Sequence, residues 1–321
     1  MISPALRRAR IPAAVALLLT LTACTTDPAD PSPASPGAST ATGSGSSFDR
    51  AEFSHLHALV YDEQARALYA ATHTGVWALP GPTAPAGAGE ITPQRVGSGT
   101  QDTMGMTLAP DGTLLASGHP GPGEAPDLAT PNLGLIRSTD GAETWESLSL
   151  AGEVDFHSLT TTETAGALRI AGLDSGTSTV LLSDDAGGTW DRGATVAAHD
   201  LAFISGAPDQ ILATTPDGLQ ISEDAGQTFS MLDGAPLLVF VETMDNGGVV
   251  GIDTGGAVWT ASRDATGWES HGKVSGGALE AMTAAPGPDP DAAPILVVST
   301  DEGVMSSADL GATWASVVEI S

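Results

Sequence analysis

SDDAGGTW, at Ser183–Trp190, decides the fold because the same pattern recurs along the chain. Related copies are STDGAETW at Ser138–Trp145, SEDAGQTF at Ser222–Phe229, SADLGATW at Ser307–Trp314 and the shorter SRDATGW at Ser262–Trp268. The closing aromatic residues stand at positions 145, 190, 229, 268 and 314. The repeat is therefore roughly 40 to 45 residues long, which is the length of one four-stranded propeller blade.

The pattern SxDxGxTW predicts a tight turn between two strands. Its Ser and Asp side chains can bond backbone amides, its Gly can take a positive φ, and its Trp can pack into the blade. The motif resembles the Asp-box, or BNR repeat, of sialidases and related propeller proteins. That resemblance implies that the boxes lie on the outer part of each blade, far from any ligand. We therefore expect their aspartates and tryptophans to be architectural.

A boxless first blade precedes the repeats. Leu68–Leu79 reads LYAATHTGVWAL, which has the strand, glycine turn and strand that come before the box in other copies. No segment shows convincing helical periodicity. The sequence thus predicts an all-β, six-bladed β-propeller in a domain of residues 51–321, with seven blades as the alternative.

The N-terminus has the layout of a secretory signal: Arg7, Arg8 and Arg10 precede an apolar stretch at Ile11–Leu21. Residues 21–24 read LTAC and resemble the lipobox of bacterial lipoproteins, which implies cleavage after residue 23 and lipid attachment to Cys24. Residues 24–50 are rich in Ser, Thr, Pro, Ala and Gly, which predicts a disordered linker. We expect an exported protein, anchored by lipid to the outer face of the cell membrane.

Composition limits the partners. The chain has 11 Lys and Arg against 39 Asp and Glu, and removing the three arginines of the signal leaves 11 − 3 = 8 basic residues. Such a charge repels nucleic acid, so we expect no nucleic-acid partner and regard cations as natural ligands. Cys24 is the only cysteine, so no intramolecular disulfide can form. We expect a monomer.

Histidines and methionines recur where each blade begins. Aligning the six innermost strands by the apolar residue that follows places these residues at one equivalent position: His57, Met106, His157, His199, Val239 and Met282. Two residues earlier, on the same side of the strand, lie His55, Met104, Asp155 and Glu280. The turn after the second strand carries His73 and His119 in two blades.

Three interpretations of this ring stay open. The polar side chains could line a wet channel, hold a small organic ligand, or bind a transition metal such as copper, for which imidazole and thioether are suitable ligands. The metal or ligand candidates are His55, His57, His73, Met104, Met106, His119, His157, His199 and Met282.

Catalysis and protein binding are the other two classes. The resemblance to sialidases implies an inward arginine triad and a tyrosine nucleophile, but neither assembles from this sequence. Asp155 and Glu280 are weak candidates for a glycoside hydrolase on position alone. The insert Pro120–Pro131 would be the natural contact of a protein-binding propeller or assembly factor.

Overall fold

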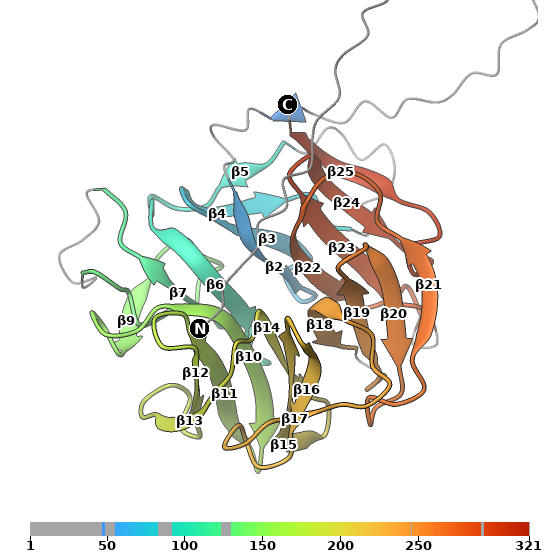
Figure 1. The fold of residues 1–321 in the computed structure, drawn as a ribbon. Coiled ribbons are helices and arrows are strands. Elements are labelled where there is room, and N and C mark those ends of the chain that lie inside the picture. Colours follow the sequence, from blue (N-terminus) through green and yellow to red (C-terminus); the bar gives the residue numbers. More distant parts are fainter. Residues whose placement is uncertain are drawn as a thin grey trace, which may run out of the picture. The chain divides into compact units, whose positions relative to one another are not determined.

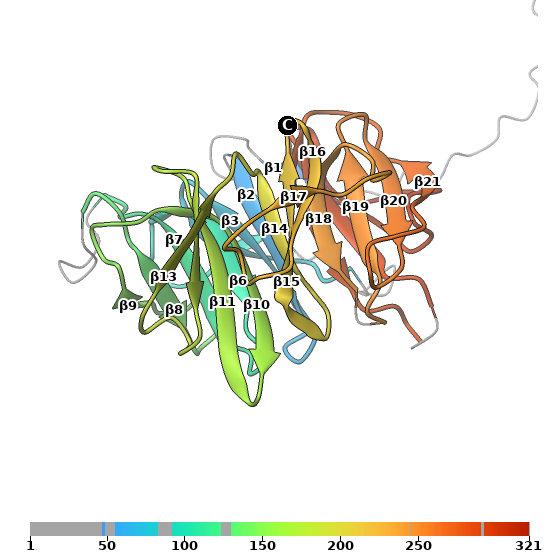
Figure 2. The same ribbon diagram turned by 60° about the horizontal axis from the view of Figure 1, so that its bottom comes forward.

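The computed structural model describes residues 47–48, 55–82, 92–122, 130–244, 246–289 and 292–320. These residues form six sheets arranged as blades around a central axis (Figure 1; Figure 2). The six-bladed all-β propeller is confirmed, and neither a helix nor a seventh blade occurs in the described ranges. Accordingly, no helix there is long and apolar enough to cross a bilayer. The predicted signal peptide, Cys24 and linker residues 24–46 lie outside these ranges.

Each blade is an antiparallel meander whose first strand is the innermost. Blade 1 contains β2 (Leu56–Asp62), β3 (Ala67–Thr72), β4 (Gly75–Leu79) and β5 (Gln94–Arg95). Blade 2 contains β6 (Asp102–Leu108), β7 (Leu114–His119), β8 (Leu135–Ser138) and β9 (Glu146–Ser149). Blade 3 contains β10 (Phe156–Thr164), β11 (Ala167–Asp174), β12 (Thr179–Ser183) and β13 (Asp191–Thr195).

The second half of the ring repeats the same order. Blade 4 contains β14 (Asp200–Ile204), β15 (Ala207–Thr215), β16 (Gly218–Ser222) and β17 (Ser230–Met231). Blade 5 contains β18 (Leu238–Thr243), β19 (Val249–Asp253), β20 (Ala257–Ala261) and β21 (Glu269–Lys273). Blade 6 contains β22 (Leu279–Ala285), β23 (Ile295–Thr300), β24 (Gly303–Ser307) and β25 (Ala315–Ile320).

A short N-terminal strand extends blade 6. β1 (Ser47–Phe48) pairs in parallel with β25, with Ser47 opposite Glu319 and Phe48 opposite Ile320. The predicted linker of residues 24–50 therefore includes a segment that is paired to the propeller. A composition rich in Ser and Gly does not reveal such pairing, because parallel addition to an edge needs only free backbone groups.

The repeated turns are held by side-chain hydrogen bonds. In the blade 3 copy, Ser183 Oγ donates to Asp185 Oδ1 (2.8 Å) and accepts from Gly187 N (2.8 Å). Asp185 accepts from the backbone N and the hydroxyl of Thr189, both at 2.7 Å. These bonds, led by the one from Thr189 N, lower the pKa of Asp185 to about 2. The copies that begin at residues 138, 222 and 307 have the same four bonds.

The backbone of these turns explains the displaced glycine of the first copy. Two successive residues are left-handed, with φ of 57° at Ala186 and 88° at Gly187 in blade 3. In STDGAETW the pair is Gly141 (72°) and Ala142 (71°). Because both positions need positive φ, a glycine at either one relieves part of the strain.

Flat blade faces pack against each other to form the core. Each of the six apolar clusters is shared by two neighbouring blades, so the clusters close a ring. The turn aromatics take part: Trp190 packs on Phe156 and donates from Nε1 to Ser149 Oγ of blade 2 (2.9 Å). Trp314 of blade 6 similarly donates to the Lys273 carbonyl of blade 5 (2.9 Å). These aromatic residues therefore connect neighbouring blades.

Replacing Gly187 with Ala should destabilise the protein strongly. The new Cβ would require a left-handed alanine and would collide with Leu135, which is fully buried in blade 2. We expect a loss of roughly 2–4 kcal/mol in the free energy of unfolding, measured by urea denaturation. Gly166→Ala is the matched control: its φ is 80°, but nothing lies within 4 Å of its Cβ. Equal losses in the two variants would contradict tight packing between blades at this turn.

Candidate functional site

A β-bulge recurs at the start of the innermost strands. In β2, Leu56 pairs with Thr72 and Ala58 with Ala71, so that His57 is skipped by the ladder. The same shift occurs in four other blades. The skipped residues are His57, Met104, His157, Val239 and Glu280. Bulges change the direction of the side chains that they carry, and here they do so at one end of the channel.

The ladder corrects the predicted alignment of the strands in blades 2 and 6. Met104 and Glu280, rather than Met106 and Met282, are the equivalents of His57. The alignment by the following apolar residue was therefore two residues late in these two blades, because the bulge residue, and not that apolar residue, is the equivalent point of each ladder. The correct register places Asp102 level with His55, and Asp102 is a site residue that the sequence analysis missed.

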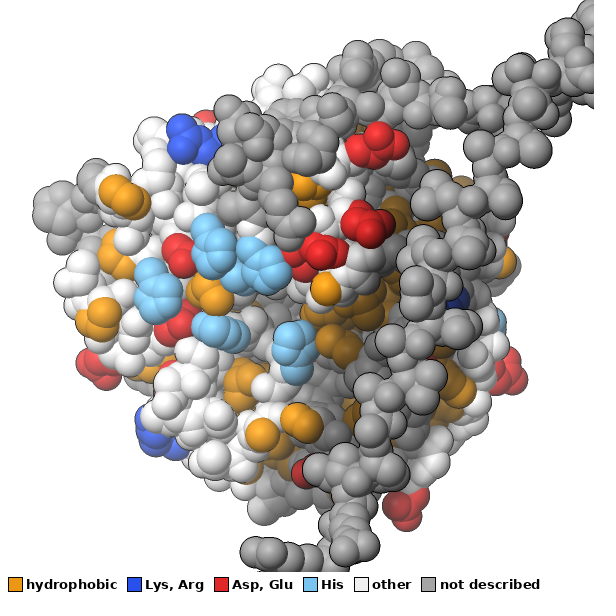
Figure 3. All heavy atoms as spheres, turned by 45° about the horizontal axis from the view of Figure 1, so that its top comes forward, with side chains coloured by type: hydrophobic (Ala, Val, Ile, Leu, Met, Phe, Trp, Pro, Cys, Tyr) orange, Lys and Arg blue, Asp and Glu red, His pale blue; other side chains and the backbone are white. Residues whose placement is uncertain are grey.

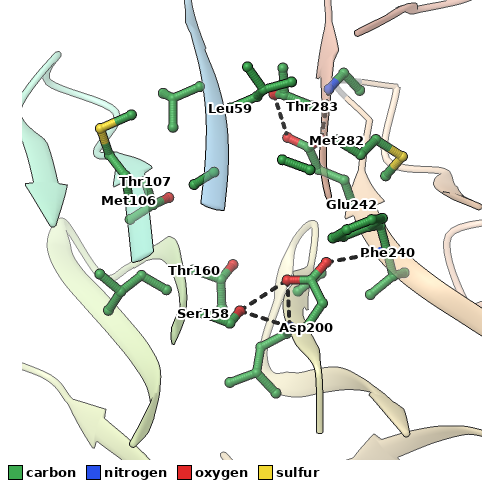
Figure 4. Close-up of a pocket in the computed structure, with 18 of the residues that line it drawn as sticks. Leu59, Met106, Thr107, Ser158, Thr160, Asp200, Phe240, Glu242, Met282 and Thr283 are labelled. Atoms are coloured by element: carbon green, nitrogen blue, oxygen red, sulfur yellow. Dashed lines mark hydrogen bonds between the residues drawn. The ribbon is translucent and has the colours of Figure 1, made fainter. Parts of the chain in front are cut away.

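Met106 and Met282 do not join the histidines. Met106 packs among buried apolar residues between blades 1 and 2, and Met282 packs against the cluster between blades 5 and 6. Both line the wall of a channel cavity of about 310 Å³, and their sulfur atoms are turned away from its centre (Figure 4). They are therefore poorly placed to bind a metal together with the imidazoles.

Two carboxylates inside this cavity join blades. Asp200 accepts from Ser158 Oγ of blade 3 (3.0 Å) and from the backbone N of Val241 of blade 5 (3.0 Å), as Figure 4 shows in part. Glu242 accepts from Ala284 N of blade 6 (2.7 Å). Burial raises the pKa of Asp200, although these hydrogen bonds oppose the shift. The arrangement fits a structural role in the channel wall.

The histidines gather on one face of the propeller, among acidic side chains (Figure 3). Three contacts between a histidine and a carboxylate cross consecutive blade boundaries there. His55 Nδ1 of blade 1 is 2.6 Å from Glu280 Oε1 of blade 6. His73 Nδ1 is 2.7 Å from Asp102 Oδ1 of blade 2, and His119 Nε2 is 3.5 Å from Asp155 Oδ2 of blade 3. We call this region, on blades 6, 1, 2 and 3, the mouth.

Three residues at the boundary of blades 1 and 2 bring possible metal ligands close together. His57, His73 and Asp102 each offer a ligand atom, and these atoms lie within 4.8 Å of one another. His57 Nε2 is 3.3 Å from His73 Nδ1 and 3.8 Å from Asp102 Oδ1. We call these three residues the primary site. Elsewhere in the described residues, no other group of three His, Cys, Asp or Glu meets this criterion.

His57 is held in its neutral form. Burial and the positive charge of His73 lower the pKa of His57 from 6.5 to about 4, although Asp102 opposes the shift. The rings of His55 and His73 lie 5.3 and 4.4 Å from that of His57. A neutral imidazole keeps a lone pair for a metal, and protons compete with it only under acidic conditions.

Asp155 is the centre of a second group. Its Oδ2 accepts from His157 Nε2 (2.8 Å) and Ser175 Oγ (3.0 Å). Burial alone would raise the pKa of Asp155, but these hydrogen bonds and the charges of His157 and His119 outweigh it, so that the pKa is lowered. Asp155 and Glu280, the two weak catalytic candidates, thus stand on blades 3 and 6 and are both engaged by histidines.

The remaining histidines are separate from these groups. The ring of His199 packs edge-on against Phe240 (5.2 Å between centroids). His271 lies on the outermost strand of blade 5, where its Nε2 is 2.7 Å from Thr260 Oγ1. The predicted contact insert is described only at residues 120–122 and 130–131.

Comparisons with known proteins show the fold alone. No protein-family model matches the sequence. No curated protein matches it either. Among solved structures, an ancestral GH74 enzyme has a TM-score of 0.52 at 12% identity, over 78% of this chain and 36% of that one. A gluconolactonase from Xanthomonas campestris has a TM-score of 0.54 at 13% identity, over 77% of this chain and 83% of that one. A GH74 xyloglucanase from Xanthomonas campestris has a TM-score of 0.49 at 18% identity, over 82% of this chain and 45% of that one.

The chain covers less than half the length of the GH74 enzymes that it resembles. The likeness places this chain among β-propeller proteins, and the site residues must indicate its function.

Acid should destabilise the metal-free protein through His57. Its pKa is about 4 in the folded protein and about 6.5 in an unfolded chain, so the unfolded chain binds an extra proton between these pH values. The free energy of unfolding should therefore fall as the pH drops from about 6.5 to 4, by up to about 3 kcal/mol from this residue. Urea denaturation with a chelator present measures the change.

The variant His57→Gln should lose less stability than the wild type between pH 7 and pH 4. His271→Gln changes an exposed histidine of blade 5 and should keep the wild-type dependence. Identical pH dependence in wild type and His57→Gln would show that His57 is not held neutral by the fold.

Proposed function

We propose that this protein is an exported, lipid-anchored propeller that binds a transition metal ion at the mouth of its channel. The observation that carries the proposal is the primary site, where two imidazoles and one carboxylate bring their ligand atoms within 4.8 Å of one another. These three residues come from two blades and from positions far apart in sequence. The fold therefore assembles a ligand set that no local motif contains.

The chemistry of the ligand set supports a borderline ion. Two imidazoles and a carboxylate suit Zn²⁺, Cu²⁺ or Fe²⁺, and leave coordination positions open to water or a substrate. The separations of 3.3 and 3.8 Å between His57 Nε2 and its two partners are close to those of neighbouring ligands around one ion. Binding would displace the proton between His73 and Asp102, whose atoms now lie at hydrogen-bond distance.

Charge favours the same conclusion. The chain carries a net charge of −28, and acidic side chains surround the imidazoles on the mouth face (Figure 3). Such a field raises the local concentration of cations and speeds their association. Copper remains a proposal within this class, supported by imidazole ligands and by the position of Met104 at the bulge next along the ring.

Glycoside hydrolysis is a second candidate, supported by the fold shared with a GH74 enzyme and by the resemblance of the repeats to Asp-boxes. The positions of the carboxylates favour glycoside hydrolysis less than metal binding. Asp155 and Glu280 stand on different blades, and each already has a histidine as its partner. The raised pKa of Asp200 is accompanied by three hydrogen bonds that tie both its oxygens to the wall.

Loss of the primary site should remove one bound ion. We expect the double variant His57→Ala, His73→Ala to bind Zn²⁺ and Cu²⁺ at this site at least about 100-fold more weakly, since loss of an outer-shell partner alone typically costs 10–100-fold. Isothermal titration and elemental analysis of protein purified without a histidine tag measure this. His271→Ala is the control and should bind as the wild type does. Unchanged stoichiometry and affinity in the double variant would refute the proposal.

The lipid anchor has its own test. Replacing Cys24 with Ala removes the only thiol that could receive a lipid. We expect the protein to move from the membrane fraction to the soluble exported fraction and to lose the mass of its lipid, measured by fractionation and intact mass spectrometry. A Cys24→Ala protein that stays in the membrane fraction would contradict lipid anchoring through this residue.

A further inference from the structure

The arrangement of the primary site recurs one blade further along the ring. At the boundary of blades 1 and 2, the primary site contains the bulge residue of the first strand (His57), the residue at the end of the second strand (His73) and a carboxylate from the next blade (Asp102). At the boundary of blades 2 and 3, the equivalent positions hold Met104, His119 and Asp155. His157, at the bulge of blade 3, adds an imidazole to the same carboxylate.

The proton on His119 is fixed by its other contact. His119 Nδ1 lies 3.0 Å from the carbonyl oxygen of Pro131, which can only accept, so Nδ1 carries the hydrogen. In the neutral form of His119 the lone pair is therefore at Nε2, and this atom lies 3.5 Å from Asp155 Oδ2. A cation placed between the two atoms would be bound by both.

The distance between His119 Nε2 and Asp155 Oδ2 matches that of two ligands of one ion better than it matches a hydrogen bond. A distance of 3.5 Å is at the long limit for a hydrogen bond. Around a tetrahedral ion with bonds of about 2.0–2.2 Å, two neighbouring N and O ligands lie about 3.4 Å apart.

Asp155 also has an unused oxygen. The residue is 5% exposed, and Asp155 Oδ1 is buried with no hydrogen-bond partner among the described residues. Buried carboxylate oxygens are normally satisfied, and a cation bound by both oxygens of Asp155 would satisfy this one. The side chains of His119 and His157 are 43% and 41% exposed, which leaves the group open to solvent at the mouth.

We propose that His119, His157 and Asp155 form a second site for a borderline divalent transition metal ion such as Zn²⁺ or Cu²⁺. His119 Nε2 and the Asp155 carboxylate are the fixed ligands, and His157 must turn to bring its Nε2 to the same ion, because the ligand atoms of the three residues do not all lie within 4.8 Å of one another as they stand. His157 Nε2 now donates to Asp155 (2.8 Å) and becomes a ligand when that proton leaves. The inference extends the proposed function to two ions at one mouth, but it rests on residues that the primary site does not use.

Zinc titration of the full-length protein, without a histidine tag, tests the proposal. The wild type should bind two equivalents of Zn²⁺, measured by isothermal titration and by elemental analysis after gel filtration. His119→Ala should bind one, the double variant His57→Ala, His73→Ala should bind one, and the triple variant none. His119→Gln, closer in size to histidine, provides a second variant, and thermal melting followed by circular dichroism checks that each variant folds.

The outcomes separate the two sites. The wild type could instead bind a single equivalent of Zn²⁺. If His119→Ala loses that equivalent and the double variant His57→Ala, His73→Ala keeps it, the second site stands and the primary site fails. If wild type and both His119 variants bind the same number of ions with the same affinity, the second site is overturned. Long-range proton–nitrogen spectra add an independent readout, because Zn²⁺ should shift His119 Nε2 and His157 Nε2 but leave His199, on the same face, unchanged.

Discussion

Apolar packing between the flat faces of neighbouring blades is the constraint on which the rest of this structure depends. Six clusters, each shared by two blades, form a closed ring, so no blade can shift without disturbing two interfaces. The cluster between blades 6 and 1 joins Val297 and Val304 to Leu56 and Leu68, which lie at opposite ends of the domain in sequence. Because the ring closes, the six first strands must surround one channel, and their ends must meet at common faces.

The mouth is a consequence of that closure combined with a local irregularity. A bulge at the start of five innermost strands frees one residue per strand from the ladder. In blades 1 and 3 this residue is a histidine, and in blade 6 it is Glu280. Glu280 contacts His55 across the boundary of blades 6 and 1, and His57 lies beside the contact between His73 and Asp102 across the boundary of blades 1 and 2. Polar groups thus connect these blades where the apolar core ends.

The mouth is also asymmetric. Blades 6, 1, 2 and 3 supply imidazoles and carboxylates, whereas blades 4 and 5 supply His199 against Phe240, and Val239 at the bulge. Inside the channel cavity, Asp200 and Glu242 accept hydrogen bonds from backbone amides of adjacent blades. Carboxylates thus serve two purposes in one channel. Those fully bonded to the wall hold it together, whereas Asp155 contacts histidines with one oxygen and keeps the other buried without a partner in the described residues.

The sequence by itself determined the six-bladed fold, because turns such as SDDAGGTW carry their own hydrogen bonds and need only local residues. It also indicated that His57, His73 and His119 lie near the channel mouth, since strand period and turn position are local properties. Only the tertiary structure decided the register, which places Met106 and Met282 in the channel wall and Asp102 beside His73 at the mouth. The candidate metal site across two blades depends on distances between strands that are far apart in sequence, and those distances are set by how the whole ring packs.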